Sequence, residues 1–519
     1  MSETKTQEFS KWRAFFWPIY NHELKKIIPM LFLFFCISFN YTILRDTKDT
    51  LIVTAPGSGA EAIPFLKVWG VLPSAVLFML VYSKLSNIFS KKTLFYGTIT
   101  LFITFFTLFA FVLYPLKDVL HPTTLADRLM DVLPQGFYGL VAIFRNWIYA
   151  LFYIMAELWG SVGISLLFWG FANDITKVGE SKRFYTMFGL GANLALLVSG
   201  PTISYFSDIK DRLPAGVDAW GVSLHYLLSF VAISGVLCMA LYYYVDKYVL
   251  TDPRFFNPAE VKKSKAEKPK MSLKESFLFL TKSKYIGYLA NLILSYGVAI
   301  NLIEVTWKGQ LKLQYPDPSA YNNFMGKFST WTGAVTVFMM LFVGGNVIRR
   351  FGWTKASLVT PVVLLITGVG FFSFILFRDN LLGFISMFGT SPLMLAVVFG
   401  TIQNIMSKSA KYSLFDPTKE MAYIPLDQES KTKGKAAIDV VGARLGKSGG
   451  SMIQQALMVG FGTLAAITPY IAVILLAIIA IWIFASKALG KQFAQLSEER
   501  EAAATAKALA TEQPQGATT

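Results

Sequence analysis

The sequence predicts an all-α membrane protein with about twelve transmembrane helices in two six-helix halves. Of its 519 residues, 54% are hydrophobic and only 15% are charged, whereas about a quarter of the residues of soluble domains are charged. Apolar windows long enough to cross a bilayer recur along the chain, and a lysine-rich interval divides them into two groups. The composition is therefore that of a polytopic membrane protein.

Windows of about 20 apolar residues predict the individual spans. In the first half they cover residues 27–44, 62–83, 93–114, 147–172, 184–206 and 221–245. In the second half they cover residues 284–305, 324–348, 355–377, 381–406, 436–461 and 465–486, of which 436–461 is the least clearly marked. Six spans on each side of a basic interval predict two halves around a central cavity, as in major-facilitator carriers.

The spans divide the chain into five segments. They are an interfacial or cytoplasmic N-terminus (1–26), the first half (27–245), a basic linker (246–283), the second half (284–486) and a low-complexity tail expected to be disordered (487–519). Lysine and arginine gather in the linker, both tails and the loops on the same side. The positive-inside rule therefore places both termini in the cytoplasm and explains most of the net charge of +16.

Several classes of site find no support in the sequence. Cys36 and Cys238 both lie in apolar runs, so no disulfide framework is indicated. His22, His121 and His225 are scattered and have no metal-ligand spacing. These positions therefore predict no metal site. We also expect no catalytic residues, no cofactor and no nucleic-acid binding, and the resemblance described below implies no enzymatic activity.

Four charged residues lie inside predicted spans: Lys67, Glu157, Glu304 and Lys447. A charged side chain at the bilayer centre costs roughly 2.5–3.5 kcal/mol on insertion scales unless it is compensated. Glu157 is close to mid-span, whereas Lys67 and Glu304 lie within two turns of a span end and could snorkel, as could Arg444.

Two interpretations of these charges remain open. They could pair as structural salt bridges between helices, or they could line a hydrated path. Buried ion pairs rarely improve on hydrophobic replacements, so charge kept at depth favours the second interpretation. Ammonium groups facing each other from two halves suit a polyanion such as a phosphate chain, because lysine supplies compact charge and three donors.

The stretch "GARLGKSGG" (442–450) is close to a phosphate-binding loop but does not match one. The Walker A pattern requires four residues between its two glycines, whereas Gly442 and Gly446 enclose three. No second nucleotide-binding motif accompanies it. Lys447 can still meet a phosphate from a glycine-flanked helix.

Several long stretches together resemble one known family. They are "NYTILRDTKDTLIVTAPGSGAEAIPFLKVWG", "AELWGSVGISLLFWGFANDIT", "RFYTMFGLGANLALLVSG", "INLIEVTWKGQLK" and "KYSLFDPTKEMAYIPLDQESKTKGKAAIDVVGARLGKSGG". They look like the ATP/ADP translocase family, the nucleotide transporters of plastids and of obligate intracellular bacteria such as chlamydiae and rickettsiae. The resemblance covers about residues 10–490. Plastid members begin with a long transit peptide that is missing here, so we expect a bacterial protein most like the chlamydial members.

The resemblance implies exchange of external ATP for internal ADP, with phosphate accompanying ADP, across a bacterial inner membrane by alternating access and without hydrolysis. We expect these three solutes and membrane lipid as the partners, and a monomer. In the family, charged residues inside spans matter for transport, and here they match Lys67, Glu157, Glu304 and Lys447.

Further candidates follow from position alone. Asn301, Asn193, Trp159 and Phe168 could contact adenine, which needs an apolar or aromatic slot with a few hydrogen bonds, although each could equally be ordinary packing. Asn301 and Arg444 join the four span charges as substrate-binding candidates.

The stretch "LRDTKD", with Arg45, Asp46, Lys48 and Asp49, is expected at the outer end of the first span. It is either an external gate or a solvated loop.

Two rival functions remain. One is a proton-coupled nucleotide symporter of the same fold, with Glu157 or Glu304 as the proton carrier. The other is a membrane-embedded ATPase that uses the "GKSGG" loop.

Overall fold

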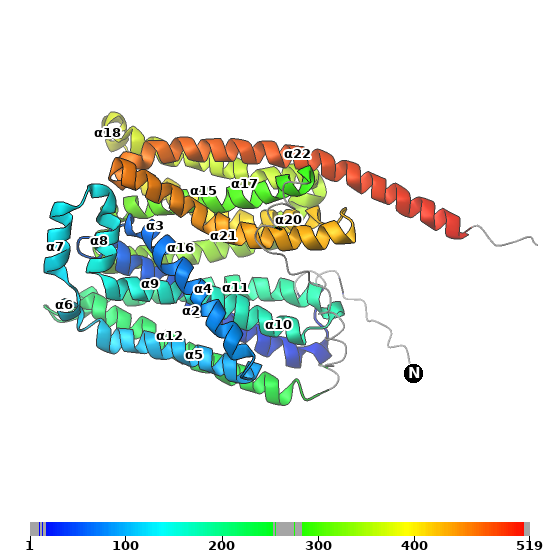
Figure 1. Cartoon of the computed structure of the whole chain (residues 1–519), viewed down its shortest axis with the longest axis horizontal. Helices are drawn as coiled ribbons and strands as arrows, with labels where there is room; N and C mark the ends of the chain where they lie inside the picture. Colours follow the sequence, from blue (N-terminus) through cyan, green and yellow to red (C-terminus); the bar gives the residue numbers. More distant parts are fainter. Residues whose placement is uncertain are drawn as a thin grey trace, which may run out of the picture.

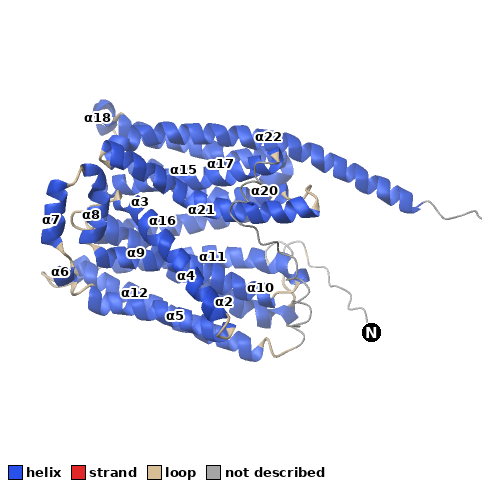
Figure 2. Cartoon of the chain, in the orientation of Figure 1, coloured by secondary structure: helices blue, strands red, loops and turns tan. Residues whose placement is uncertain are grey.

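The computed structural model describes residues 10, 13, 17–252, 255, 275 and 283–512. Within these ranges the side chains of some residues, among them Arg444 and Lys447, lie outside the description. All regular structure in the described part is helical, as predicted (Figure 2). Most of the basic linker also lies outside the described residues.

Six long helical segments form the first half, and short helices join the third to the fourth. The long segments are η1 (Asn21–Glu23) with α2 (Leu24–Val53); α3 (Ala62–Phe65), η2 (Leu66–Val71) and α4 (Leu72–Ser86); α5 (Lys91–Leu108) with η3 (Phe109–Leu113); α9 (Trp147–Trp159), η5 (Gly160–Phe168) and α10 (Trp169–Ile175); α11 (Val178–Ser207); and α12 (Ala219–Tyr248). The short helices are α6 (Lys117–Leu120), α7 (Thr123–Val132), η4 (Gln135–Phe137) and α8 (Tyr138–Arg145), and η6 (Lys210–Arg212) follows α11.

The second half is built in the same way. Its elements are α15 (Lys284–Gln314), α16 (Pro318–Phe338), η7 (Met339–Val343), α17 (Gly344–Leu376), α18 (Arg378–Ser386), α19 (Pro392–Ala410), η8 (Lys411–Phe415), α20 (Asp416–Ala422), α21 (Gln428–Phe461) and α22 (Leu464–Glu512). In Figure 1, α5 and α12 lie along the lower edge, and α17 and α22 along the upper edge.

We name the two ends of the bundle by the elements that lie there. The far end carries α6, α7, α8 and α18, and the linker end carries α10, α20 and the last described residues before the linker (Figure 1). Helices α2 and α11 run toward the far end, and α16 runs away from it. A contact between the halves can therefore be described by its position between the far end and the linker end.

Ten helical segments of the described chain are long and apolar enough to cross a membrane. They contain eleven of the twelve predicted spans, because Pro318–Leu376 joins the eighth and ninth. Gly352 interrupts that segment with a φ of 76°, a conformation that glycine adopts without strain. The remaining predicted span lies in α21, which is 34 residues long but too polar to be among the ten.

Three predicted boundaries are wrong. The first helix does not end at residue 44 but continues to Val53. The tenth span does not begin at residue 381, because α18 ends at Ser386 and Ser391 caps a new helix that has Pro392 in its first turn. The tail expected to be disordered from residue 487 is helical as far as Glu512, where an alanine-rich sequence favours the helix.

Small residues bring the two halves into close contact at α11 and α16. A Cβ atom added at Gly326 would lie 2.7 Å from the carbonyl oxygen of Gly200 and 2.6 Å from the hydroxyl of Ser204. Only glycine allows this approach. Hydrogen bonds continue the contact toward the far end, where Ser204 donates to the carbonyl of Asn323 over 3.1 Å and Asn322 donates to Ser207 over 2.8 Å.

Candidate functional site

Helix α2 carries the four charged residues Arg45, Asp46, Lys48 and Asp49 into the contact between the halves. The sequence placed them at the end of a span or in a solvated loop, but they lie inside the helix and are buried or nearly so. Thr50 donates to the carbonyl of Asp46 over 3.0 Å and so satisfies a polar hydroxyl within the helix. Burial is tolerated because the charged groups find partners of opposite sign.

Asp49 joins the two halves through a pair of lysines. Its Oδ1 lies 2.8 Å from Nζ of Lys48, and its Oδ2 lies 2.7 Å from Nζ of Lys308 on α15. Lys48 also lies 3.0 Å from Oε1 of Glu157 on α9, and Lys308 lies 3.2 Å from Oε1 of Glu304. Five charged groups from three helices therefore form one connected network.

The network extends to α16 and α19. Nζ of Lys408 lies 3.9 Å from the same Glu304 oxygen and 4.8 Å from the ring centroid of Phe328. Arg45 lies 2.9 Å from Oδ1 of Asp46 and donates to the hydroxyl of Ser329 over 2.7 Å. Ser329 in turn donates to Oδ2 of Asp46 over 2.5 Å. A hydroxyl of the second half thus bridges an ion pair of the first.

Lys67 reaches the second half through a different contact. It lies on η2, a π-helical turn between α3 and α4, and donates to Oδ1 of Asn301 over 2.8 Å. Ser451 on α21 donates to the same oxygen over 3.3 Å. Such π-helical turns are frequent at functional sites. The structure thus brings Lys67 and Asn301 together.

Two predicted site residues, Lys447 and Arg444, have side chains outside the described residues. Their backbone lies in α21, and Ser451 follows Lys447 by one helical turn. Glycines hold this part of α21 against α15, because a Cβ at Gly297 would lie 2.8 Å from backbone atoms of Gly446. The whole stretch 442–450 is helical, so its amides are committed to helix bonds and it forms no phosphate-binding loop.

Accessibility divides the network into two layers. Lys48, Asp49 and Lys308 have side chains only 1–3% exposed. Glu157 is 30% exposed, and Glu304 and Lys408 are each 19% exposed. Solvent therefore reaches one side of the network, and the other side is closed by the packing of the two halves.

Sequence reasoning missed Lys308 and Lys408 as members of the site. The predicted seventh span stopped at residue 305 and the tenth at residue 406, so both lysines fell just outside. One signal was available for Lys308, since it follows Glu304 by four residues and an acid followed by a base at this spacing shares a helix face. No comparable signal marked Lys408.

The residues predicted from position alone to contact adenine mostly pack elsewhere. Trp159 is 1% exposed and donates to the carbonyl of Ile37 over 3.2 Å. The ring of Phe168 stacks on Phe34 with centroids 3.9 Å apart. Asn193 donates to the carbonyl of Gly189 over 2.9 Å. The contacts of Trp159 and Phe168 hold helices together, and that of Asn193 lies within its own helix. Asn301 is the candidate that contacts Lys67.

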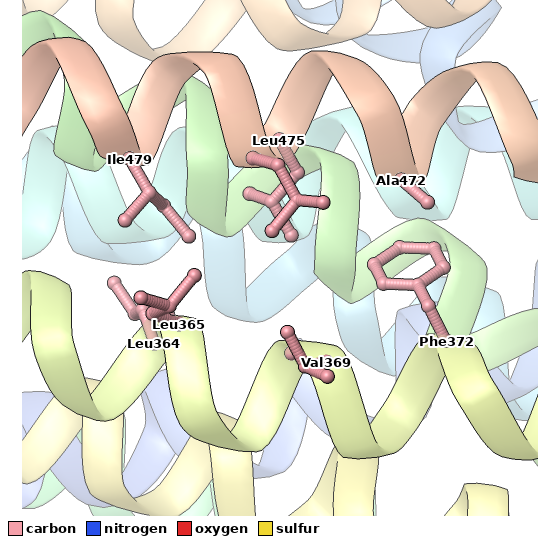
Figure 3. A pocket seen from close by; sticks show the side chains of 9 residues that line it. Leu364, Leu365, Val369, Phe372, Ala472, Leu475 and Ile479 are labelled. Carbon is pink, nitrogen blue, oxygen red and sulfur yellow. The ribbon is translucent and has the colours of Figure 1, made fainter.

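An apolar pocket elsewhere does not suit a charged solute. It lies between α17 and α22, and its volume is about 30 Å³, roughly the space that one water molecule occupies (Figure 3). Leu364, Val369, Phe372, Ala472 and Leu475 are among its lining residues, all of which are apolar. Among the described residues, no group of three or more His, Cys, Asp or Glu side chains could hold a metal ion. The charged network is therefore the candidate site.

Comparison with known proteins agrees with this picture. Residues 2–493 of the chain match the model of a family described as "TLC ATP/ADP transporter". The chain is 61% identical over 502 residues to "ADP,ATP carrier protein 1" of Chlamydia pneumoniae, a match covering 96% of this chain and 98% of that protein. It is 55% identical over 478 residues to "ADP,ATP carrier protein 1, chloroplastic" of Arabidopsis thaliana, covering 92% of this chain and 75% of that one.

Solved structures resemble the fold alone. A bacterial homologue of the iron transporter ferroportin superposes with a TM-score of 0.53 at 12% identity, covering 91% of this chain and all of that one. The xylose transporter XylE from E. coli superposes with a TM-score of 0.51 at 10% identity, covering 89% of this chain and 96% of that one.

The two-halved helical fold, with a charged network between the halves, is that of a multi-pass membrane protein, and in fold alone it resembles these solved transporters. Family membership places the chain among transporters and not among enzymes. The chain belongs to the TLC ATP/ADP transporter family.

Proposed function

We propose that this protein exchanges ATP for ADP across a bacterial inner membrane by alternating access. The family and the chlamydial and plastid carriers support the choice of substrates. The observation that carries the proposal is the network of ammonium groups contributed by both halves, at Lys48, Lys67, Lys308 and Lys408. Ammonium groups bind phosphate oxygens through short charge-assisted hydrogen bonds.

The substrate-binding roles are part of the proposal and are supported by the contacts of the described residues and, for Lys447 and Arg444, by the sequence. We assign Lys67, with Lys447 and Arg444 of α21, to the phosphates. Asn301 lies beside Lys67 and can accept from the nucleotide or hold the lysine in place. Glu157 and Glu304 neutralise the lysines while the site is empty and release them to the nucleotide.

Charge explains why transport should be an exchange. The described network holds five cations (Arg45, Lys48, Lys67, Lys308 and Lys408) and four carboxylates (Asp46, Asp49, Glu157 and Glu304), before Lys447 and Arg444 are added. Closing the empty site would remove water from uncompensated positive charge, which is costly. A bound nucleotide neutralises that charge, so the loaded carrier reorients faster than the empty one.

Phosphate completes the proposed cycle. ATP and ADP differ by about one charge at neutral pH, so a one-for-one swap would move net charge across the membrane. Phosphate leaving with ADP as its monoanion would make the exchange electroneutral.

The orientation and assembly also belong to the proposal. Basic loops place both termini and the linker in the cytoplasm, so the far end faces outward. A monomer embedded in lipid is sufficient, because the charged network is built from one chain.

Vesicles containing the purified protein test the exchange. Vesicles preloaded with ADP should take up labelled ATP, and empty vesicles should take up almost none. Uptake should persist when an uncoupler collapses the proton gradient. Equal uptake by empty and loaded vesicles, or loss of uptake with the uncoupler, would instead support proton-coupled nucleotide symport through Glu157 or Glu304.

A further inference from the structure

We propose that Lys48 and Lys308 form a second phosphate-binding subsite, beyond Lys67 and Lys447, and that Asp49 occupies this subsite while no nucleotide is bound. The inference rests on the proposed nucleotide exchange and adds residues that neither the sequence nor the family resemblance assigned to binding.

The first support is the geometry of Asp49. Its two oxygens take one ammonium group each, Lys48 from the first half at 2.8 Å and Lys308 from the second half at 2.7 Å. Two oxygens of a phosphate group can make the same pair of contacts, because carboxylate and phosphate are both bidentate oxyanions. Asp49 thus holds an anion site that an incoming phosphate can take over.

The second support comes from two tyrosines beside this pair. Tyr153 on α9 and Tyr321 on α16 are completely buried, and their hydroxyls have no hydrogen-bond partner among the described residues. Both hydroxyls lie in the electrostatic field of Asp49 and Glu304. Nζ of Lys48 lies 3.9 Å from the ring centroid of Tyr153. Buried hydroxyls normally have partners, so these two are free to donate to a phosphate bound at the subsite.

The subsite also links binding to movement. Asp49 and Lys308 belong to different halves, so their ion pair holds the halves together on the far-end side of the site. A phosphate that displaces Asp49 from Lys308 breaks this link. Nucleotide entering from the linker end would thereby release the far end, whereas the empty protein keeps it closed.

Binding to the purified full-length protein tests the subsite. The binding of labelled ATP, and its displacement by inorganic tripolyphosphate, are measured for the Lys308→Gln variant. Lys312→Gln is the matched control. Lys312 lies one turn further along α15, where it donates to the carbonyl of Ser58 in the other half. We expect Lys308→Gln to bind ATP and tripolyphosphate about tenfold or more weakly than wild type. The affinities of the control should stay within about twofold of wild type.

Two further variants keep the test independent of folding. Tyr321→Phe removes only a hydroxyl that has no hydrogen-bond partner among the described residues, so the variant should fold normally and bind both anions about fivefold more weakly. Asp49→Asn removes the competing carboxylate, so it should tighten tripolyphosphate binding.

The outcomes separate this inference from the proposed function. If Lys308→Gln and Lys312→Gln lost the same affinity for ATP and tripolyphosphate, Lys308 would be only a contact that closes the far end. Unchanged tripolyphosphate binding by Lys308→Gln would overturn the subsite. So would weaker binding by Asp49→Asn. If wild type exchanges ATP for ADP while these variants fail to behave as stated, only the subsite is refuted. If wild type neither binds nor exchanges nucleotide, the proposed function fails as well.

Discussion

At the scale of single residues, each charge kept at depth has a partner of opposite sign or a polar contact. Glu157, which has no cation in its own span, faces Lys48 at 3.0 Å. Lys67 faces the amide oxygen of Asn301. Pairing offsets part of the cost of burying a charge, and it leaves each group able to exchange its partner for a substrate. This property distinguishes a transport site from a purely structural ion pair.

Lys67→Gln and Lys447→Gln should each reduce nucleotide exchange severely while the protein still inserts and folds. Loss of one hydrogen bond to a charged group costs roughly 1.5–3 kcal/mol, a factor of about ten to over a hundred in rate or affinity. Uptake into ADP-loaded vesicles measures the effect. Lys84→Gln is the control, because Lys84 is an exposed lysine on the same helical segment as Lys67. If either variant took up nucleotide as fast as the control, the lysine it replaces would only snorkel and would not bind substrate.

Glu157→Gln tests the two interpretations of the buried carboxylates. We expect slower exchange with normal folded yield, since the amide can still accept a hydrogen bond from Lys48 but no longer neutralises it. Folded yield by size-exclusion chromatography is measured beside uptake. Normal uptake together with a collapse in yield would show that the Lys48–Glu157 pair serves only to hold the helices.

At the scale of elements, the contact of α11 with α16 determines how closely the halves approach. Glycine at positions 200 and 326 allows backbone to meet backbone there. Helices that must part and close again during transport need such a smooth surface, because long interlocking side chains would have to repack in every cycle.

Gly326→Val should hinder closure of the far end. The added side chain would meet Ser204 and the carbonyl of Gly200, and overpacking of this kind costs roughly 1–3 kcal/mol, so exchange should fall about tenfold. Gly97→Val on α5 is the control, because a Cβ there has open space within 4 Å. Equal exchange rates for the two variants would remove α11 and α16 from the moving contact.

At the scale of the whole molecule, the contacts between the halves differ between the two sides of the charged network. Ion pairs and hydrogen bonds close the far-end side of the network, and Glu157, Glu304 and Lys408 are reached by solvent. Under the proposed alternating access, these contacts are the ones that would have to break for the far end to open.

Sidedness is tested by cysteine labelling. Lys265→Cys in the linker should resist a membrane-impermeant thiol reagent added to intact cells and react after the cells are opened. The native Cys36 and Cys238 are free and buried, so they give little background. Labelling from outside would reverse the proposed topology.

The sequence by itself determined the membrane class, the two halves and the family, because these depend on apolar run length and on long stretches of matching residues. It also singled out Lys67, Glu157 and Glu304, since a charge inside an apolar window is visible without a structure. Residues near the edge of an apolar window were harder to place. The predicted first span ended before Arg45–Asp49, and the predicted seventh and tenth spans ended before Lys308 and Lys408.

Only the tertiary structure decided which charges meet. Asp49 pairs with Lys308 across a distance of 259 positions in the chain, as their numbers show, and no local pattern in one sequence specifies such a partner. The same holds for Lys67 with Asn301 and for Gly200 with Gly326. Periodicity determines which residues share a helix face, but contact between faces depends on how all the helices pack together.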